Sequence, residues 1–143
     1  MPTSSNFAFT LGISEEGDCR DELTIDEDPT SATTNLDQSS EVATVIDHWG
    51  GTAVLNRLEF ISGVDRVDNR DAPVSIVHGT ADATVPFREA EVWRDAHEST
   101  GVAEEWNPLA TVGHGPGRVR VGDQTLVESA ADFIVEIQRL QVR

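Results

Sequence analysis

Two short apolar runs constrain the fold of this chain more than any other feature of its sequence. Residues 42–46 read Val-Ala-Thr-Val-Ile, and residues 74–77 read Val-Ser-Ile-Val. Both runs are continuous and rich in β-branched residues, which favour extended backbone. Strands of this composition are typically covered on both faces, as in a parallel sheet flanked by helices. We therefore predict that these two runs are buried strands of a parallel sheet.

Helical and strand-like patterns alternate along the remainder of the chain. They predict, in order, helix 52–60, strand 74–77, helix 87–100, strand 104–109 and helix 124–142. In the helix at 87–100, Ala90, Val92 and Trp93 are expected to face inward, whereas His97 is expected to be exposed. Asp123 is expected to cap the last helix, whose apolar residues recur at three- and four-residue spacing. The predicted class is α/β, a single domain over residues 1–143 with a partial parallel sheet, flanking helices and right-handed crossovers.

The charge of the chain is strongly negative. It has 26 acidic residues and 10 basic residues, all of them Arg, so the formal net charge is −16. A field of this sign repels nucleic acid and anionic lipid. Residues 14–40 carry many of the acidic side chains and few large apolar ones, so they are expected to form a solvated polar excursion. Two explanations of the composition stay open, adaptation to high salt, which we favour, and an ordinary acidic protein.

Several kinds of partner and cofactor are not expected. No apolar run approaches the ~18 residues of a membrane span. Residues 1–9 lack the basic and apolar regions of a secretory signal, so the compartment is unknown and cytoplasmic by default. Cys19 is the single cysteine, which excludes an intramolecular disulfide. Because no metal-ligand spacing of Cys and His and no Gly-rich phosphate loop is present, no metal and no cofactor are predicted.

Ionisable side chains follow three successive strands of the predicted sheet. Asp47 and His48 follow the first strand, Asp82 follows the second, and His114 follows the third between two glycines. Because ligands bind at the carboxyl ends of parallel strands, these residues form the candidate site. A carboxylate that accepts the Nδ1 hydrogen of a histidine fixes its tautomer and stabilises the imidazolium. Asp82 and His114 are the predicted pair, although Asp82 as a turn cap and His114 as a surface loop residue are open alternatives.

The segment Val-Ser-Ile-Val-His-Gly-Thr-Ala-Asp-Ala-Thr-Val-Pro-Phe, followed by Gly-His-Gly and an amphipathic helix, resembles the last third of the α/β-hydrolase superfamily. The resemblance is to its esterase/lipase branch of bacterial and archaeal carboxylesterases, and it extends over residues 6–138. It implies that Asp82 is the acid of a catalytic triad and His114 its general base, with a small-molecule ester as substrate. His78 would be a structural residue of the strand-end turn. The order Asp before His agrees with the order Ser, Asp, His of this superfamily.

The other residues at the strand ends have weaker assignments. Asp47 is an alternative acid, because some hydrolases of this fold place the acid one strand earlier. His48 and Trp49 are candidates for the lining of a substrate pocket, although packing at the strand end explains them equally well.

The chain departs from the family pattern at the nucleophile. The elbow Gly-x-Ser-x-Gly would be expected before residue 6, where Ser4 and Ser5 are not flanked by glycine. Around Ser14, Glu16 replaces the second glycine. We therefore expect the chain to be inactive or nearly so by itself, and its first strand to expose an edge prone to self-association or to pairing with the missing half. The alternatives are a non-catalytic pseudo-hydrolase or interaction module, and a gene fragment without an independent role.

Overall fold

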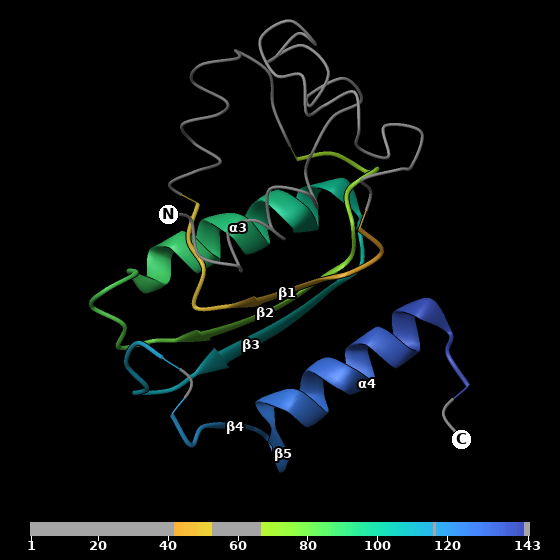
Figure 1. The fold of residues 1–143 in the computed structure, drawn as a ribbon. Helices are drawn as coiled ribbons and strands as arrows, with labels where there is room; N and C mark the ends of the chain where they lie inside the picture. The colour runs from red at the N-terminus through yellow and green to blue at the C-terminus, as the bar shows by residue number, and fades with distance from the viewer. Residues whose placement is uncertain (1–41, 53–66, 116, 142–143) are drawn as a thin grey trace, which may run out of the picture.

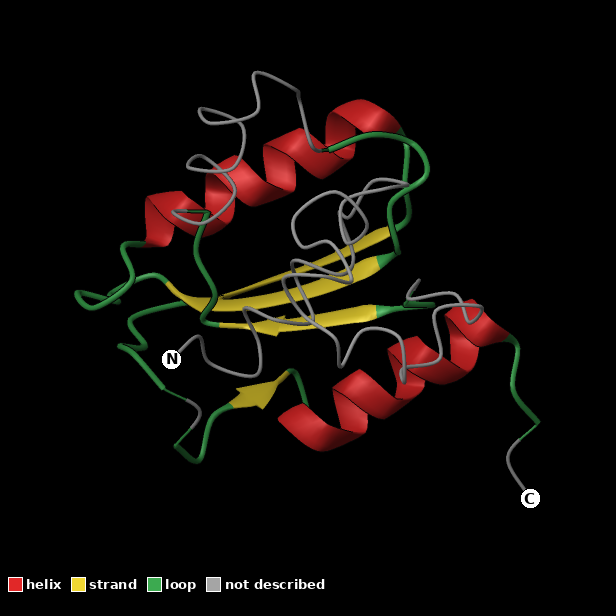
Figure 2. Cartoon of the chain, turned by 45° about the horizontal axis from the view of Figure 1, so that its top comes forward, coloured by secondary structure: helices red, strands yellow, loops and turns green. Residues whose placement is uncertain are grey.

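The computed structural model describes residues 42–52, 67–115 and 117–141. Three parallel strands form its sheet in the order β1-β2-β3: β1 (Val45–His48), β2 (Val74–Gly79) and β3 (Glu104–Leu109). Helix α3 (Phe87–Thr100) covers one face of this sheet, and α4 (Leu126–Gln138) covers the other (Figures 1 and 2). The predicted α/β class, with a partial parallel sheet and flanking helices, is confirmed.

The central strand shows why a continuous apolar run becomes the middle of such a sheet. All six residues of β2 are buried, since β1 and β3 occupy its two edges and a helix lies over each face. The register aligns Val74 with Val45 on β1 and with Glu104 on β3. The hydrophobic core between the sheet and α3 contains Val45, Ala72, Val74, Ile76, Ala90 and Trp93, with Trp106 packed against it.

β1 differs from the prediction in its boundaries. The run at 42–46 was expected to form the strand, with Asp47 and His48 in the following turn, but β1 begins at Val45 and includes both of these residues. Pairing begins where the amide of Val45 donates to the carbonyl of Pro73, and it continues until His48 pairs with Val77. The partner strand, rather than the apolar run itself, therefore sets the ends of β1.

Helix α3 has the predicted bounds but a different inner face. Pro86 precedes it, and Gly101 ends it in the left-handed conformation with φ of 75°. Ala90 and Trp93 are buried as expected, whereas Val92 is 37% exposed and His97 is only 1% exposed. The expectations for Val92 and His97 were wrong, because residues 90, 93 and 97 follow three- and four-residue spacing and share one face of the helix.

Helix α4 begins two residues later than predicted. A short hairpin of β4 (Arg120–Val121) and β5 (Gln124–Thr125) precedes it. Thr125, not Asp123, is the N-cap: its side chain accepts from the amide of Glu128, whose carboxylate in turn accepts from the amide of Thr125. This reciprocal capping box satisfies two amides that the start of a helix leaves free.

Two of the predicted segments, helix 52–60 from residue 53 onward and the acidic excursion 14–40, lie outside the described residues, as does Cys19. No helix within the described ranges is long and apolar enough to cross a membrane.

Candidate active site

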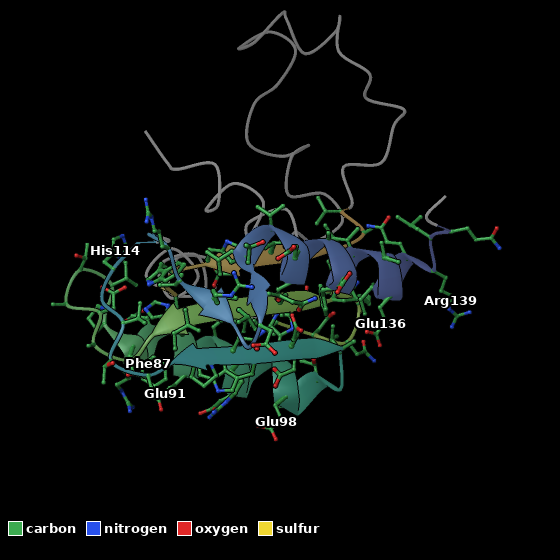
Figure 3. The ribbon with its side chains drawn as sticks, turned by 90° about the horizontal axis from the view of Figure 1, so that it is seen from below. Phe87, Glu91, Glu98, His114, Glu136 and Arg139 are labelled. Carbon is green, nitrogen blue, oxygen red and sulfur yellow. The ribbon has the colours of Figure 1, made fainter. Side chains whose placement is uncertain are left out.

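Asp82 and His114 meet at the carboxyl end of the sheet. Asp82 lies in the turn after β2, and His114 lies in the loop after β3. His114 Nδ1 is 2.8 Å from Asp82 Oδ2. The Asp82 side chain is fully buried, while 39% of the His114 side chain is exposed. Figure 3 places His114 at the same end of the molecule as Phe87, the first residue of α3, and at the opposite end from Glu136 and Arg139.

The turn after β2 holds the Asp82 carboxylate in place. Asp82 Oδ1 accepts from the amides of Thr84, at 2.8 Å, and Val85, at 3.0 Å. Burial opposes ionisation of this carboxyl, but the hydrogen bonds from His114, Thr84 and Val85 outweigh it and keep its pKa below the ordinary value. Asp82 is therefore a carboxylate at neutral pH, with Oδ1 satisfied by the backbone and Oδ2 directed at His114.

The loop that carries His114 packs directly against the end of β2. The amide of Ala81 donates to the carbonyl of Val112 at 2.9 Å. A Cβ at Gly79 would lie 2.3 Å from the same carbonyl oxygen, so only glycine permits this approach. The two loops are thereby joined through their backbones, which fixes the distance between Asp82 and His114.

Trp49 holds the same loop from the side of β1. It is 5% exposed, and its indole N–H donates to the carbonyl of Gly113 at 2.9 Å. Its φ of 58° lies in the left-handed region, which is unusual for a bulky side chain and costs backbone strain. Sequence reasoning did not find this role. The only signal was a large donor-bearing side chain directly after a buried strand and before two glycines.

The other residues predicted at the strand ends have different surroundings. Asp82, rather than the alternative acid Asp47, contacts His114. Asp47 is buried in β1, and burial raises its pKa to about 6, despite the opposing effects of His78 and the Gly50 amide. His48 is half-buried with its ring 6.2 Å from that of Trp49, and burial lowers its pKa. A pocket formed by His48 and Trp49 stays a prediction.

The described residues include no group of His, Cys, Asp and Glu that could hold a metal ion. Ser4, Ser5 and Ser14 all lie outside the described residues. The pair that is described can accept a proton at His114 Nε2, because Asp82 occupies the other ring nitrogen.

The family model described as the prolyl oligopeptidase family matches residues 23–140, which is most of the chain. The chain belongs to the prolyl oligopeptidase family. This assignment, together with the parallel sheet between two helices, places it in the α/β-hydrolase superfamily, as the strand and loop motifs predicted. A comparison with curated proteins gave no match.

Several solved structures similar to this member of the prolyl oligopeptidase family are esterases. Esterase 2 from the planctomycete Thermogutta terrifontis, phosphorylated by paraoxon, is 28% identical with a TM-score of 0.61. A propionate-bound structure of the Thermogutta terrifontis esterase is 26% identical with a TM-score of 0.56. A truncated carbohydrate esterase from gut microbiota, 24% identical with a TM-score of 0.58, shares the fold.

These matches cover 75% to 77% of this chain but only 46% to 48% of the solved ones. The chain therefore spans about half the length of the esterase structures that it resembles.

Proposed function

We propose that this chain is the acid- and histidine-bearing part of a serine-dependent carboxylic-ester hydrolase, with Asp82 as the acid and His114 as the general base. The observation that carries this proposal is the 2.8 Å contact between His114 Nδ1 and Asp82 Oδ2 at the carboxyl end of the sheet. The esterase titles of the similar structures support the choice of an ester as substrate.

The geometry supports a complete proton cycle. With its Nδ1 hydrogen donated to Asp82, His114 has Nε2 free to take the proton of a serine hydroxyl as the oxygen attacks an ester carbonyl. The same nitrogen then gives that proton to the leaving alcohol, and an acyl-serine is formed. In the second half of the cycle, water loses a proton to Nε2 and attacks the acyl group. As the bond from the acyl carbon to the serine oxygen breaks, Nε2 returns the proton to that oxygen, so the acid is released and the serine hydroxyl is restored. Asp82 stays ionised throughout and stabilises the imidazolium.

We propose that the nucleophile comes from a segment other than those described. The 143 residues contain no Gly-x-Ser-x-Gly sequence. The chain covers 46% to 48% of the esterases that it matches, which supports a nucleophile in the remaining half of the hydrolase. We accordingly propose that this chain alone is inactive or nearly so, since an imidazole and a carboxylate without a serine have only water to activate.

The edge of β1 is the proposed contact with that other half. β1 pairs with β2 along one side, and its second side has no strand partner among the described residues. An open, apolar strand edge readily pairs with another strand. We propose that the segment bearing the nucleophile adds to the sheet here, and that without it the chain tends to associate with itself.

A hybrid hydrolase tests the proposed function. This chain would be joined to the part of Thermogutta terrifontis esterase 2 that lies outside the matched region, and assayed with p-nitrophenyl esters. The hybrid should turn over and the chain alone should not. His114→Gln should lower kcat/KM of the hybrid by about 10²- to 10⁴-fold, the contribution of a general base. Asp95→Asn, at an exposed position of α3, is the control and should leave the rate unchanged.

Two results would contradict the proposal. One is robust turnover by the chain alone that is lost in Ser14→Ala. The other is a hybrid whose rate is unaffected by His114→Gln, which would favour a non-catalytic interaction module.

Because the family is named for prolyl oligopeptidase, a proline p-nitroanilide should be assayed beside the esters. Faster cleavage of the anilide would change the substrate class from ester to peptide.

A further inference from the structure

His78 is a buried histidine directly behind the Asp82–His114 pair. It lies in β2, and neither its side chain nor that of Asp82 is exposed to solvent. Its Nε2 is 2.9 Å from the carbonyl oxygen of Val85 and 3.2 Å from Asp82 Oδ2. Oδ2 is also the oxygen that contacts His114. One carboxylate oxygen therefore lies beside nitrogens of two histidines.

The hydrogen-bond partners fix where His78 carries its proton. A backbone carbonyl can only accept, so Nε2 must bear the hydrogen that is directed at Val85. Nδ1 is buried and has no hydrogen-bond partner among the residues described. The protonated, electropositive edge of the ring thus faces both the Val85 carbonyl and Asp82 Oδ2.

We infer that His78 is a positioning residue for His114, acting through Asp82. The Nε2–H of His78 donates to the carbonyl of Val85, and the amide of Val85 donates to Asp82 Oδ1. The positive edge of the His78 ring also partly offsets the negative charge on Asp82 Oδ2. This inference rests on the proposed function of Asp82 and His114. It goes beyond a structural role, because His78 would set how strongly Asp82 favours the imidazolium form of His114.

Two other groups lie close to His78. Asp47 of β1 interacts electrostatically with His78, and the ring of Phe87 in α3 lies 6.0 Å from the His78 ring. The burial of the ring means that little solvent screens its effect on Oδ2. If His78 no longer faces Oδ2, the whole charge of that oxygen acts on His114, and the imidazolium becomes more favourable.

Proton NMR titration of the full chain tests the inference, since the chain has only four histidines to assign. His78→Phe should move the pH midpoint of the His114 Hε1 signal upward by about half a unit or more. His78→Gln, which keeps an N–H donor near the position of Nε2, should restore most of the wild-type midpoint. His97→Phe is the matched control, since it replaces another buried histidine by the same residue, and it should leave the His114 midpoint unchanged.

An unchanged or lower His114 midpoint in folded His78→Phe would overturn the inference. If His78 had only a structural role, its loss would loosen Asp82 and weaken the interaction of Asp82 with His114. If His78→Phe does not fold, Asp47→Asn decides, because it removes the other carboxylate that interacts with His78. The His78 signals of that variant should move with the same midpoint as those of His114, and a stationary His78 signal would overturn the inference. Asp82→Asn should lower the His114 midpoint whatever His78 does. That variant reports on the catalytic pair separately from His78.

Discussion

At the scale of single residues, Trp49 shows how one hydrogen bond can position the loop that carries His114. Its indole N–H reaches the carbonyl of Gly113, the residue before His114. Trp49→Phe removes this donor but keeps most of the ring, so it should lower the free energy of unfolding by about 1 kcal/mol. It should also speed amide hydrogen exchange in residues 112–115, because their anchor is lost.

Chemical denaturation and hydrogen exchange measure these two effects. Trp106→Phe is the control, because it also replaces a tryptophan, one that packs beside Phe87 and against the core. Equal exchange in residues 112–115 of Trp49→Phe and Trp106→Phe would contradict the positioning role of the indole.

The residues of the site differ in how far the sequence could predict them. Asp82 and His114 were predictable as neighbours, because each follows a strand of the same parallel sheet and the carboxyl ends of such strands lie together. The contacts of Trp49 and His78 were not, since they depend on the reach and direction of a side chain across loops. Sequence spacing does not encode such directions.

At the scale of elements, α3 carries a titratable group on its inner face. His97 is 1% exposed with its ring 4.2 Å from that of Trp93, and burial lowers its pKa from 6.5 to about 4. The folded state therefore resists protonation of His97, whereas the unfolded chain takes up the proton below pH 6.5. The stability that depends on neutral His97 is complete above this pH and is lost as the pH falls from 6.5 to about 4.

His97→Phe should remove this part of the acid sensitivity. Between about pH 7.5 and pH 4, the variant should lose roughly 2–3 kcal/mol less stability than the wild-type chain. Urea unfolding at a series of pH values measures the difference. Parallel stability curves for the two proteins would show that His97 is readily protonated in the folded state.

The boundaries of elements were less predictable than their existence. The strands at β2 and β3 and the helix α3 follow from local pattern and from the flanking proline and glycine. β1 was misplaced because its ends depend on where Pro73 and Val77 offer partners. α4 was started early because residues 124 and 125 belong to a local hairpin with a two-residue turn, whose strands are too short to show a period.

At the scale of the whole molecule, the net charge of −16 predicts a dependence on salt. Like charges oppose the compact state, and raising the salt from 0.1 M to 1 M shortens the screening length from about 10 Å to about 3 Å. We therefore expect the thermal midpoint of the chain to rise when KCl is raised over this range. A midpoint that falls or stays constant would contradict the proposed adaptation to high salt.

The part of the fold that the structure describes is a three-stranded parallel sheet that brings Asp82 and His114 together at its carboxyl end. The family match and the similar esterase structures agree with that arrangement. We propose that the half of those structures that this chain does not cover supplies the strand partner that β1 lacks among the described residues. The central claim is that Asp82 holds His114 as a base with Nε2 free.

A long-range ¹H–¹⁵N spectrum of the histidine rings, recorded at about pH 8.5 where imidazole is neutral, tests this claim most directly. We expect that His114 carries its proton on Nδ1 and that Nε2 is unprotonated, and that Asp82→Asn abolishes this preference. A proton on Nε2 of His114 in the wild-type chain would contradict this claim.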